Sequence, residues 1–69
     1  MRLGLKLLRV KLNLTQEEMA KKLNVNRGTY IAIENGRRDG RLQFWENLQK
    51  SFDIPDENMW ALMKHVEEE

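Results

Sequence analysis

The sequence predicts an all-α fold, a compact bundle of five short helices in a single domain of 69 residues. Apolar residues recur at three- and four-residue spacing in five successive stretches, which is the pattern of helices with one buried face. Signals of strands are nearly absent, because no run of β-branched residues alternates with polar ones. The Asn-Gly pair at 35–36 lies between two helical patterns rather than between two candidate strands.

The first two predicted helices are separated by a short turn. The inward face of the first helix is formed by Leu5, Leu8 and Leu12. Thr15 begins the second helix and Glu18 follows three residues later, which is the spacing of a capping box that satisfies unpaired backbone N–H groups. The inward face of the second helix is formed by Met19, Ala20 and Leu23.

Three further helices follow along the chain. Asn26 is a good N-cap for the third, in which Tyr30 and Ile33 point inward. The fourth spans about Arg41 to Phe52, and its expected buried residues are Leu42, Trp45, Leu48 and Phe52. Pro55 and Asp56 open the fifth. Its apolar arc is formed by Met59, Trp60, Leu62, Met63 and Val66.

Three of the sharp corners between helices lack glycine. Asn13, Asn24 and Asp53 stand where a helix must end and the chain must turn. The left-handed conformation that suits such exits is easiest for glycine, and Asn and Asp tolerate it next best. We therefore expect these three residues to adopt it.

Charge is divided unevenly along the chain. Residues 1–41 contain ten Lys and Arg against four acids, a net charge of +6. Residues 42–69 contain two lysines and seven acids, a net charge of −5. This asymmetry favours an anionic partner for the N-terminal part. Charge alone leaves open the alternative of two solvated halves without such a partner.

The composition excludes several chemistries. There are no cysteines and His65 is the only histidine, so we predict no disulfide, metal site, cofactor or histidine-based catalysis. No acid–base or nucleophile–base constellation is visible, and we expect a protein that is not an enzyme. No apolar run reaches the roughly 18 residues of a membrane span, and the basic start lacks the cleavage site of a signal peptide. The expected location is the cytoplasm.

Residues 16–36, QEEMAKKLNVNRGTYIAIENG, carry a specific pattern. Ala20 is small enough for two helices to cross closely, Val25 fills the corner, and Tyr30 and Ile33 fasten the second helix to the first. On these features the stretch resembles the helix-turn-helix, about 16–35, of the Cro/CI-type or XRE transcriptional regulators. The resemblance continues through LQFWENLQKSFDIPDENMW and covers nearly the whole chain. It implies a lambda-repressor-like DNA-binding domain.

In that family the second helix of the motif lies in the DNA major groove, while the first crosses the phosphate backbone. The resemblance implies that Arg27 binds a guanine and that Ile31 and Ala32 touch thymine methyl groups. Gly28 and Ala32 stand where the family often has polar side chains, so direct contacts are fewer but the helix can approach the bases closely. Gln16 would donate to a phosphate. The expected DNA-contacting residues are Gln16, Asn26, Arg27, Gly28, Thr29, Ile31, Ala32, Asn35, Arg37 and Arg38, with Gly36 and Arg41 beside them.

Other residues have expected structural roles. The resemblance implies an ion pair between Glu34 and Arg9 that joins the first and third helices. We expect Tyr30 in the core with its hydroxyl at the edge, and Trp45 and Trp60 in the core rather than in a ligand site.

An apolar stripe on the first helix has no place in the predicted core. Leu3, Leu7 and Val10 lie opposite the inward face, and an exposed apolar stripe on so short a chain usually marks a contact. Trp60 and Met63 of the fifth helix either cover this stripe or meet a partner. We expect a homodimer through the fifth helix, with or without the first.

The function predicted from these features is sequence-specific binding of double-stranded DNA as a small transcriptional regulator. A repressor is favoured over an activator because occlusion of a promoter needs no additional surface. The alternative is a protein-interaction module that reuses the fold, such as an antitoxin-like partner or a scaffold, and binds through the apolar stripe of the first helix.

Overall fold

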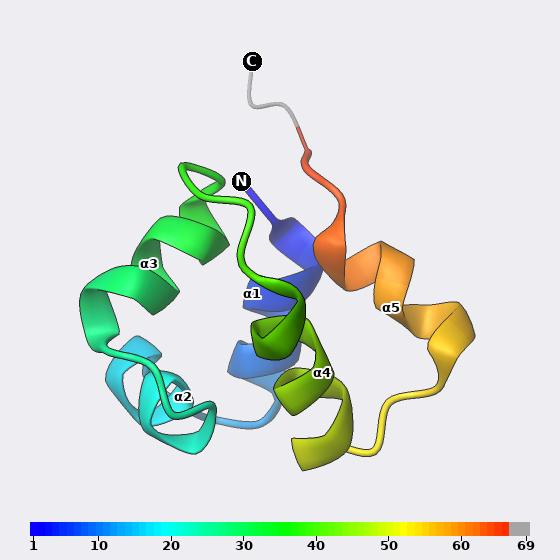
Figure 1. Ribbon diagram of the computed structural model, residues 1–69, viewed down its shortest axis with the longest axis horizontal. Coiled ribbons are helices and arrows are strands. Elements are labelled where there is room, and N and C mark those ends of the chain that lie inside the picture. Colours follow the sequence, from blue (N-terminus) through cyan, green and yellow to red (C-terminus); the bar gives the residue numbers. More distant parts are fainter. Residues whose placement is uncertain (67–69) are drawn as a thin grey trace.

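The computed structural model describes residues 1–66, and these form five helices joined by short turns (Figure 1). The predicted all-α class is confirmed. No helix among the described residues is long and apolar enough to cross a membrane. The helices are α1 (Leu3–Lys11), α2 (Gln16–Lys22), α3 (Arg27–Asn35), α4 (Leu42–Ser51) and α5 (Asp56–Met63).

The start of α2 is fixed by the capping box that the sequence predicts. The Glu18 backbone N–H donates to the Thr15 hydroxyl at 3.1 Å, and the Thr15 backbone N–H donates to the Glu18 carboxylate at 2.9 Å. The hydrogen bonds from Thr15 hold the pKa of Glu18 below its ordinary value. Two backbone donors that the helix leaves unpaired are thereby satisfied.

Sharp corners follow three of the helices. Asn13, Asn24 and Asp53 have φ values of 60°, 57° and 52°, so the prediction of left-handed corners is confirmed. The helix α3 ends differently, on Gly36 with a φ of 86°. These corners set the angles at which successive helices leave one another.

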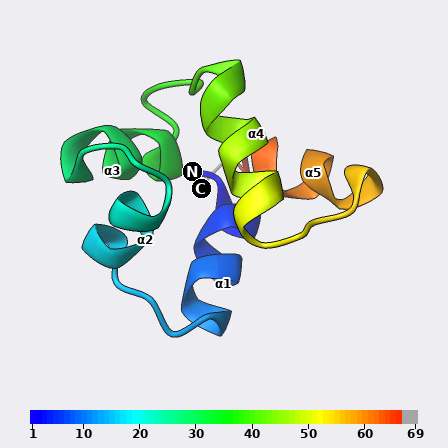
Figure 2. The ribbon, with the colours of Figure 1, turned by 60° about the horizontal axis from the view of Figure 1, so that its bottom comes forward.

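The core lies where α1, α2, α3 and α4 meet (Figure 2). Ala20 is buried, as expected for a small residue at a close helix crossing, and the backbone of Val25 donates to its carbonyl at the corner between α2 and α3. Phe44 and Trp45 pack edge to face, with ring centres 4.9 Å apart. The buried apolar residues are Leu5, Met19, Ala20, Leu23, Tyr30, Ile33, Phe44, Trp45 and Leu48.

Two residues expected in the core lie outside it. Leu42 is 74% exposed. At about 100° per residue, its position falls about 60° outside the arc of Phe44, Leu48 and Trp45. Leu12 is exposed because α1 ends at Lys11, so Leu12 caps the helix instead of continuing its inward face.

The fifth helix is shorter than predicted and buries less. Its inward residues are Met59 and Leu62, which are half-buried against the core. Trp60 stands about 100° around the helix from Met59 and is 69% exposed, so its predicted place in the core is wrong. Val66 lies beyond the helix, where its backbone N–H donates to the Met1 carbonyl at 2.8 Å.

A close contact joins α1 to α5. A Cβ on Gly4 would collide with the backbone carbonyl oxygen of Ala61, so the missing side chain lets these helices touch. Because Met1 pairs with Val66, the two ends of the described chain lie side by side at the C-terminal end of α3 (Figure 1). The fold thereby brings α1, α5 and the end of α3 together.

Tyr30 lies in the core as predicted, but its hydroxyl does not reach the edge. The hydroxyl oxygen is buried and has no hydrogen-bond partner among the described residues. Burial, reinforced by the Glu34 carboxylate, raises the pKa of Tyr30 well above its ordinary value, and the Arg9 guanidinium opposes this rise. A buried hydroxyl without a partner destabilises the folded state.

The variant Tyr30→Phe is therefore expected to raise the free energy of unfolding by up to about 1 kcal/mol, since it removes the unpaired group and keeps the ring. Urea denaturation of both proteins at one concentration measures the difference. A loss of stability larger than about 1 kcal/mol would show that the hydroxyl makes a hydrogen bond after all.

Candidate nucleic-acid interface

The first turn of α3 forms an exposed edge of the molecule. The Asn26 side-chain oxygen accepts a 2.7 Å hydrogen bond from the Thr29 backbone N–H, which confirms the predicted N-cap. Arg27 and Gly28 are exposed, and Thr29 is half-buried. Nothing but the Asn26 side chain lies near the Cβ position of Gly28, so the backbone here is open to close approach. The helix therefore presents one long cationic side chain beside bare backbone.

Further along α3 the outward face becomes apolar. Ile31 and Ala32 are half-buried, and Asn35 is exposed at the end of the helix. The opposite face carries Tyr30 and Ile33 into the core. The structure thus places the residues predicted to touch bases along one side of the helix.

A buried carboxylate fixes α3 against the first two helices. Glu34 is 1% exposed, and it accepts hydrogen bonds from Arg9 Nε at 3.0 Å and from Gln16 Nε2 at 2.6 Å. Arg9 also donates to the Leu14 carbonyl at 2.9 Å. The predicted Arg9–Glu34 ion pair is confirmed. Gln16 is half-buried and engaged inside the fold, although its amide nitrogen carries a second N–H that can serve another acceptor.

A cationic loop connects α3 to α4, and we call residues 36–41 the basic loop. Arg37, Arg38 and Arg41 are all exposed there. The backbone N–H groups of Arg37 and Arg38 both donate to the carbonyl of Ala32, at 2.9 Å and 3.2 Å. The loop therefore begins at a fixed place beside the end of α3, with its charged side chains outside.

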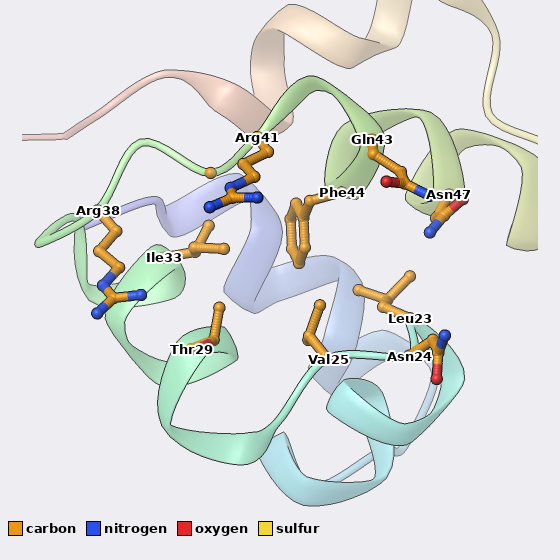
Figure 3. Close-up of a pocket in the computed structure, with 11 residues that line it drawn as sticks. Leu23, Asn24, Val25, Thr29, Ile33, Arg38, Arg41, Gln43, Phe44 and Asn47 are labelled. Carbon is orange, nitrogen blue, oxygen red and sulfur yellow. The ribbon is translucent and has the colours of Figure 1, made fainter.

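A groove of about 460 Å³ separates α3 from α4 (Figure 3). Arg38 and Arg41 stand on one side of it, and Gln43 and Asn47 of α4 on another. Its walls and floor are completed by Leu23, Asn24, Val25, Thr29, Ile33, Gly40 and Phe44. The groove thus has cationic and amide groups around an apolar floor, a combination that suits a sugar–phosphate chain.

Arg2 is a cation that the charge pattern predicted to be available to a partner and that the structure buries. It was counted with the residues that favour an anionic partner, but it is 4% exposed and its guanidinium lies inside the fold. Burial lowers the pKa of Arg2, and Asp39 opposes this change. Its nearest carboxylate oxygen, on Asp39, is 3.9 Å away and solvent-exposed, so the ion pair is weak. Arg2 is thus not available to a partner, whereas Arg27 of α3 and the three arginines of the basic loop are exposed.

The described residues contain no cluster of three or more His, Cys, Asp or Glu that could hold a metal ion. The polar groups that do converge are cationic or amide, and they lie on an exposed face rather than in an enclosed cavity. Exposed cationic and amide groups are the kinds of group that contact phosphates in nucleic-acid complexes.

The chain is similar to one family model and to several known proteins. The family model described as helix-turn-helix matches residues 5–57. An uncharacterised HTH-type transcriptional regulator of Methanocaldococcus jannaschii is 46% identical over 48 residues, which are 70% of this chain and 73% of that protein. An uncharacterised HTH-type transcriptional regulator of Archaeoglobus fulgidus is 33% identical over 60 residues, 87% of this chain and 84% of that protein.

A phage protein is also similar. The cryptic phage CTXphi transcriptional repressor RstR of Vibrio cholerae is 40% identical over 48 residues, which are 70% of this chain but 43% of the repressor. No solved structure gives a significant match to the chain.

Proposed function

The chain belongs to the Cro/CI-type (XRE) helix-turn-helix family of transcriptional regulators, and from this premise we propose that residues 1–69 act as one sequence-specific DNA-binding domain that represses transcription in the cytoplasm. The family consists of DNA-binding regulators rather than enzymes. The observation that carries the proposal is the exposed first turn of α3, together with the three exposed arginines of the basic loop that follows the same helix.

In this proposal α3 lies in the major groove of a duplex. Arg27 forms two hydrogen bonds to one guanine, and Ile31 and Ala32 contact thymine methyl groups. Gly28 contributes no side chain, and its bare backbone lets the helix sit close to the base edges. The specificity then depends on few direct contacts and on the shape of the duplex.

The phosphate contacts flank α3 on both sides. Gln16 donates its second amide N–H to a phosphate at the start of α2, and Asn26 and Thr29 approach the backbone where α3 enters the groove. On the other side the duplex runs past Asn35 and the basic loop. The proposed phosphate contacts there come from Asn35, Arg37 and Arg38, with Arg41 next to them.

The salt dependence of duplex binding tests the proposal. Each neutralised phosphate changes the slope of log affinity against log salt by about −0.9, so a protein that docks on several phosphates loses affinity steeply as salt rises. A flat slope would favour the protein-interaction module, whose candidate surface is the exposed stripe on α1. Selection of bound fragments from a random duplex library then gives the preferred sequence and its symmetry.

The proposed DNA-binding form is a homodimer. Trp60 and Met63 of α5 are exposed, and Leu3, Leu7 and Val10 of α1 form an exposed stripe that α5 leaves uncovered. Intramolecular covering of this stripe, one of the two expectations for Trp60, is therefore wrong, since Leu7 is 57% exposed. A two-fold axis would place the two α3 helices about 34 Å apart, on successive major grooves of a palindromic site.

Light scattering at several protein concentrations checks the dimer. We expect Trp60→Ala to weaken self-association, because a large exposed aromatic residue contributes strongly to an interface. The variant Leu42→Ala is the control, since Leu42 is equally exposed but lies on α4. A wild-type protein that stays monomeric even on a duplex with two half-sites would refute the dimer.

A further inference from the structure

We propose that Arg2 is a positioning residue for DNA binding, which holds the backbone of the basic loop from inside the fold so that the loop arginines face the duplex. The inference rests on the proposed function. Arg2 itself is buried and touches no DNA; it acts through the loop that it holds.

The guanidinium of Arg2 is almost completely used by backbone carbonyls. Its Nη1 donates to Ile33 O at 2.7 Å and to Arg38 O at 2.8 Å. Its Nη2 donates to Asp39 O at 3.3 Å, and its Nε donates to Met63 O at 2.8 Å. One rigid planar group therefore joins the end of α3, the basic loop and the end of α5.

A second group holds the loop at the same carbonyl. The indole N–H of Trp45 donates to the same Asp39 carbonyl at 3.1 Å, and the Arg2 guanidinium lies 5.4 Å from the centre of the Trp45 ring. Gly40 has a φ of 80°, and a Cβ on it would press against the indole. The Asp39 carbonyl thus accepts from both a buried cation and a buried aromatic ring.

The consequence for the loop side chains is geometric. With the carbonyls of Arg38 and Asp39 turned inward to Arg2, the side chains of Arg37, Arg38 and Arg41 remain outside. A loop that is already ordered loses less conformational freedom when it binds phosphates. Arg2 also donates to the Met63 carbonyl at the end of α5. The position of the basic loop is thereby linked to the helix that we propose forms the dimer.

The test compares Arg2→Met with a control of similar stability loss. Ile54→Ala is suitable because Ile54 packs against the core from the connection between α4 and α5. All proteins are measured at a temperature where each is folded, by titration of a labelled random-sequence duplex. We expect Arg2→Met to bind about tenfold more weakly, with a shallower salt slope, and Ile54→Ala to bind as the wild type does.

A double-mutant cycle separates positioning from a general structural role. If Arg2 acts through the loop, Arg38→Ala costs less affinity in the Arg2→Met background than in the wild type. Amide hydrogen exchange gives a readout without DNA, because the Arg38 N–H bonded to Ala32 O should lose protection in Arg2→Met. Where Arg2→Met fails to fold, Trp45→Phe removes the indole bond to Asp39 and is expected to give the same changes more weakly.

The outcomes are distinguishable. A variant Arg2→Met that binds duplex within twofold of the wild type, or whose effect is additive with that of Arg38→Ala, overturns the inference while the proposed function stands. A wild-type protein that binds no duplex overturns the proposed function. Amide hydrogen exchange still tests the inference in that case. Equal protection of the Arg38 N–H in the wild type and in Arg2→Met would show that Arg2 does not hold the loop.

Discussion

Replacing Glu34 by alanine is expected to lower the free energy of unfolding by about 3–5 kcal/mol, which is the usual consequence of removing one partner from a buried ion pair. Glu34 is 1% exposed and accepts from both Arg9 and Gln16. Without it the largely buried Arg9 guanidinium loses its counter-charge, and α3 loses its side-chain hydrogen bonds to Arg9 of α1 and Gln16 of α2. Urea denaturation at a fixed protein concentration measures the change.

Two further variants separate the charge from the packing. Glu34→Gln keeps the size of the side chain and removes its charge, so we expect an intermediate loss. The double variant Arg9→Met with Glu34→Leu replaces the pair by apolar groups, and it should be more stable than Glu34→Ala because no buried charge is left alone. A loss below about 1 kcal/mol in Glu34→Ala would mean that the pair does not hold the helices together.

Arg27→Ala and Arg37→Ala are expected to weaken DNA binding in different ways. A bidentate contact to guanine contributes about 1–3 kcal/mol of discrimination, so Arg27→Ala should relax the preference at one base pair of each half-site. Arg37→Ala should weaken binding to every sequence alike and make the salt slope shallower by about 1. Titration of the selected duplex and of single-base variants at several salt concentrations measures both effects.

The matched control is Lys50→Ala, which removes an exposed cation from the last turn of α4, away from α3 and the basic loop. It should leave both the affinity and the salt slope unchanged. If Arg27→Ala and Arg37→Ala behave alike on all duplexes, the assignment of base recognition to one and of phosphate contact to the other is wrong.

Much of the fold follows from local signals in the sequence. The capping box at Thr15, the Asn26 cap and the left-handed corner at Asn24 all depend on residues within three or four positions of one another. Such interactions can be recognised from spacing alone because the chain itself brings the partners together. The small residue Ala20 at the helix crossing was recognised from the helix-turn-helix pattern.

The features that the sequence missed depend on contacts between distant segments. Arg2 donates to carbonyls 31 to 61 positions away, and no spacing pattern distinguishes such a residue from an exposed arginine. The helical period placed Trp60 within the apolar arc of the fifth helix, but the short helix buries only Met59 and Leu62 in part. The Tyr30 hydroxyl was expected at the edge, and the surrounding core closes over it.

For the candidate interface, the sequence predicted the exposed arginines but not the internal contacts that hold the residues around them. The family resemblance implied that Arg27, Gly28 and the loop arginines contact DNA, and all of them are exposed in the structure. The internal bond of Gln16 to Glu34 was not visible in the sequence, since the implied role of Gln16 was only a phosphate contact. What keeps the basic loop in place also required the structure.

Amide chemical-shift mapping during titration with duplex DNA tests the central claim most directly. If α3 and the basic loop bind the duplex, the largest changes fall on residues 26–32 and 35–41, and they fade as salt is raised. Changes that gather instead on Leu3, Leu7 and Val10 of α1, or a spectrum that does not respond to duplex, would contradict the account.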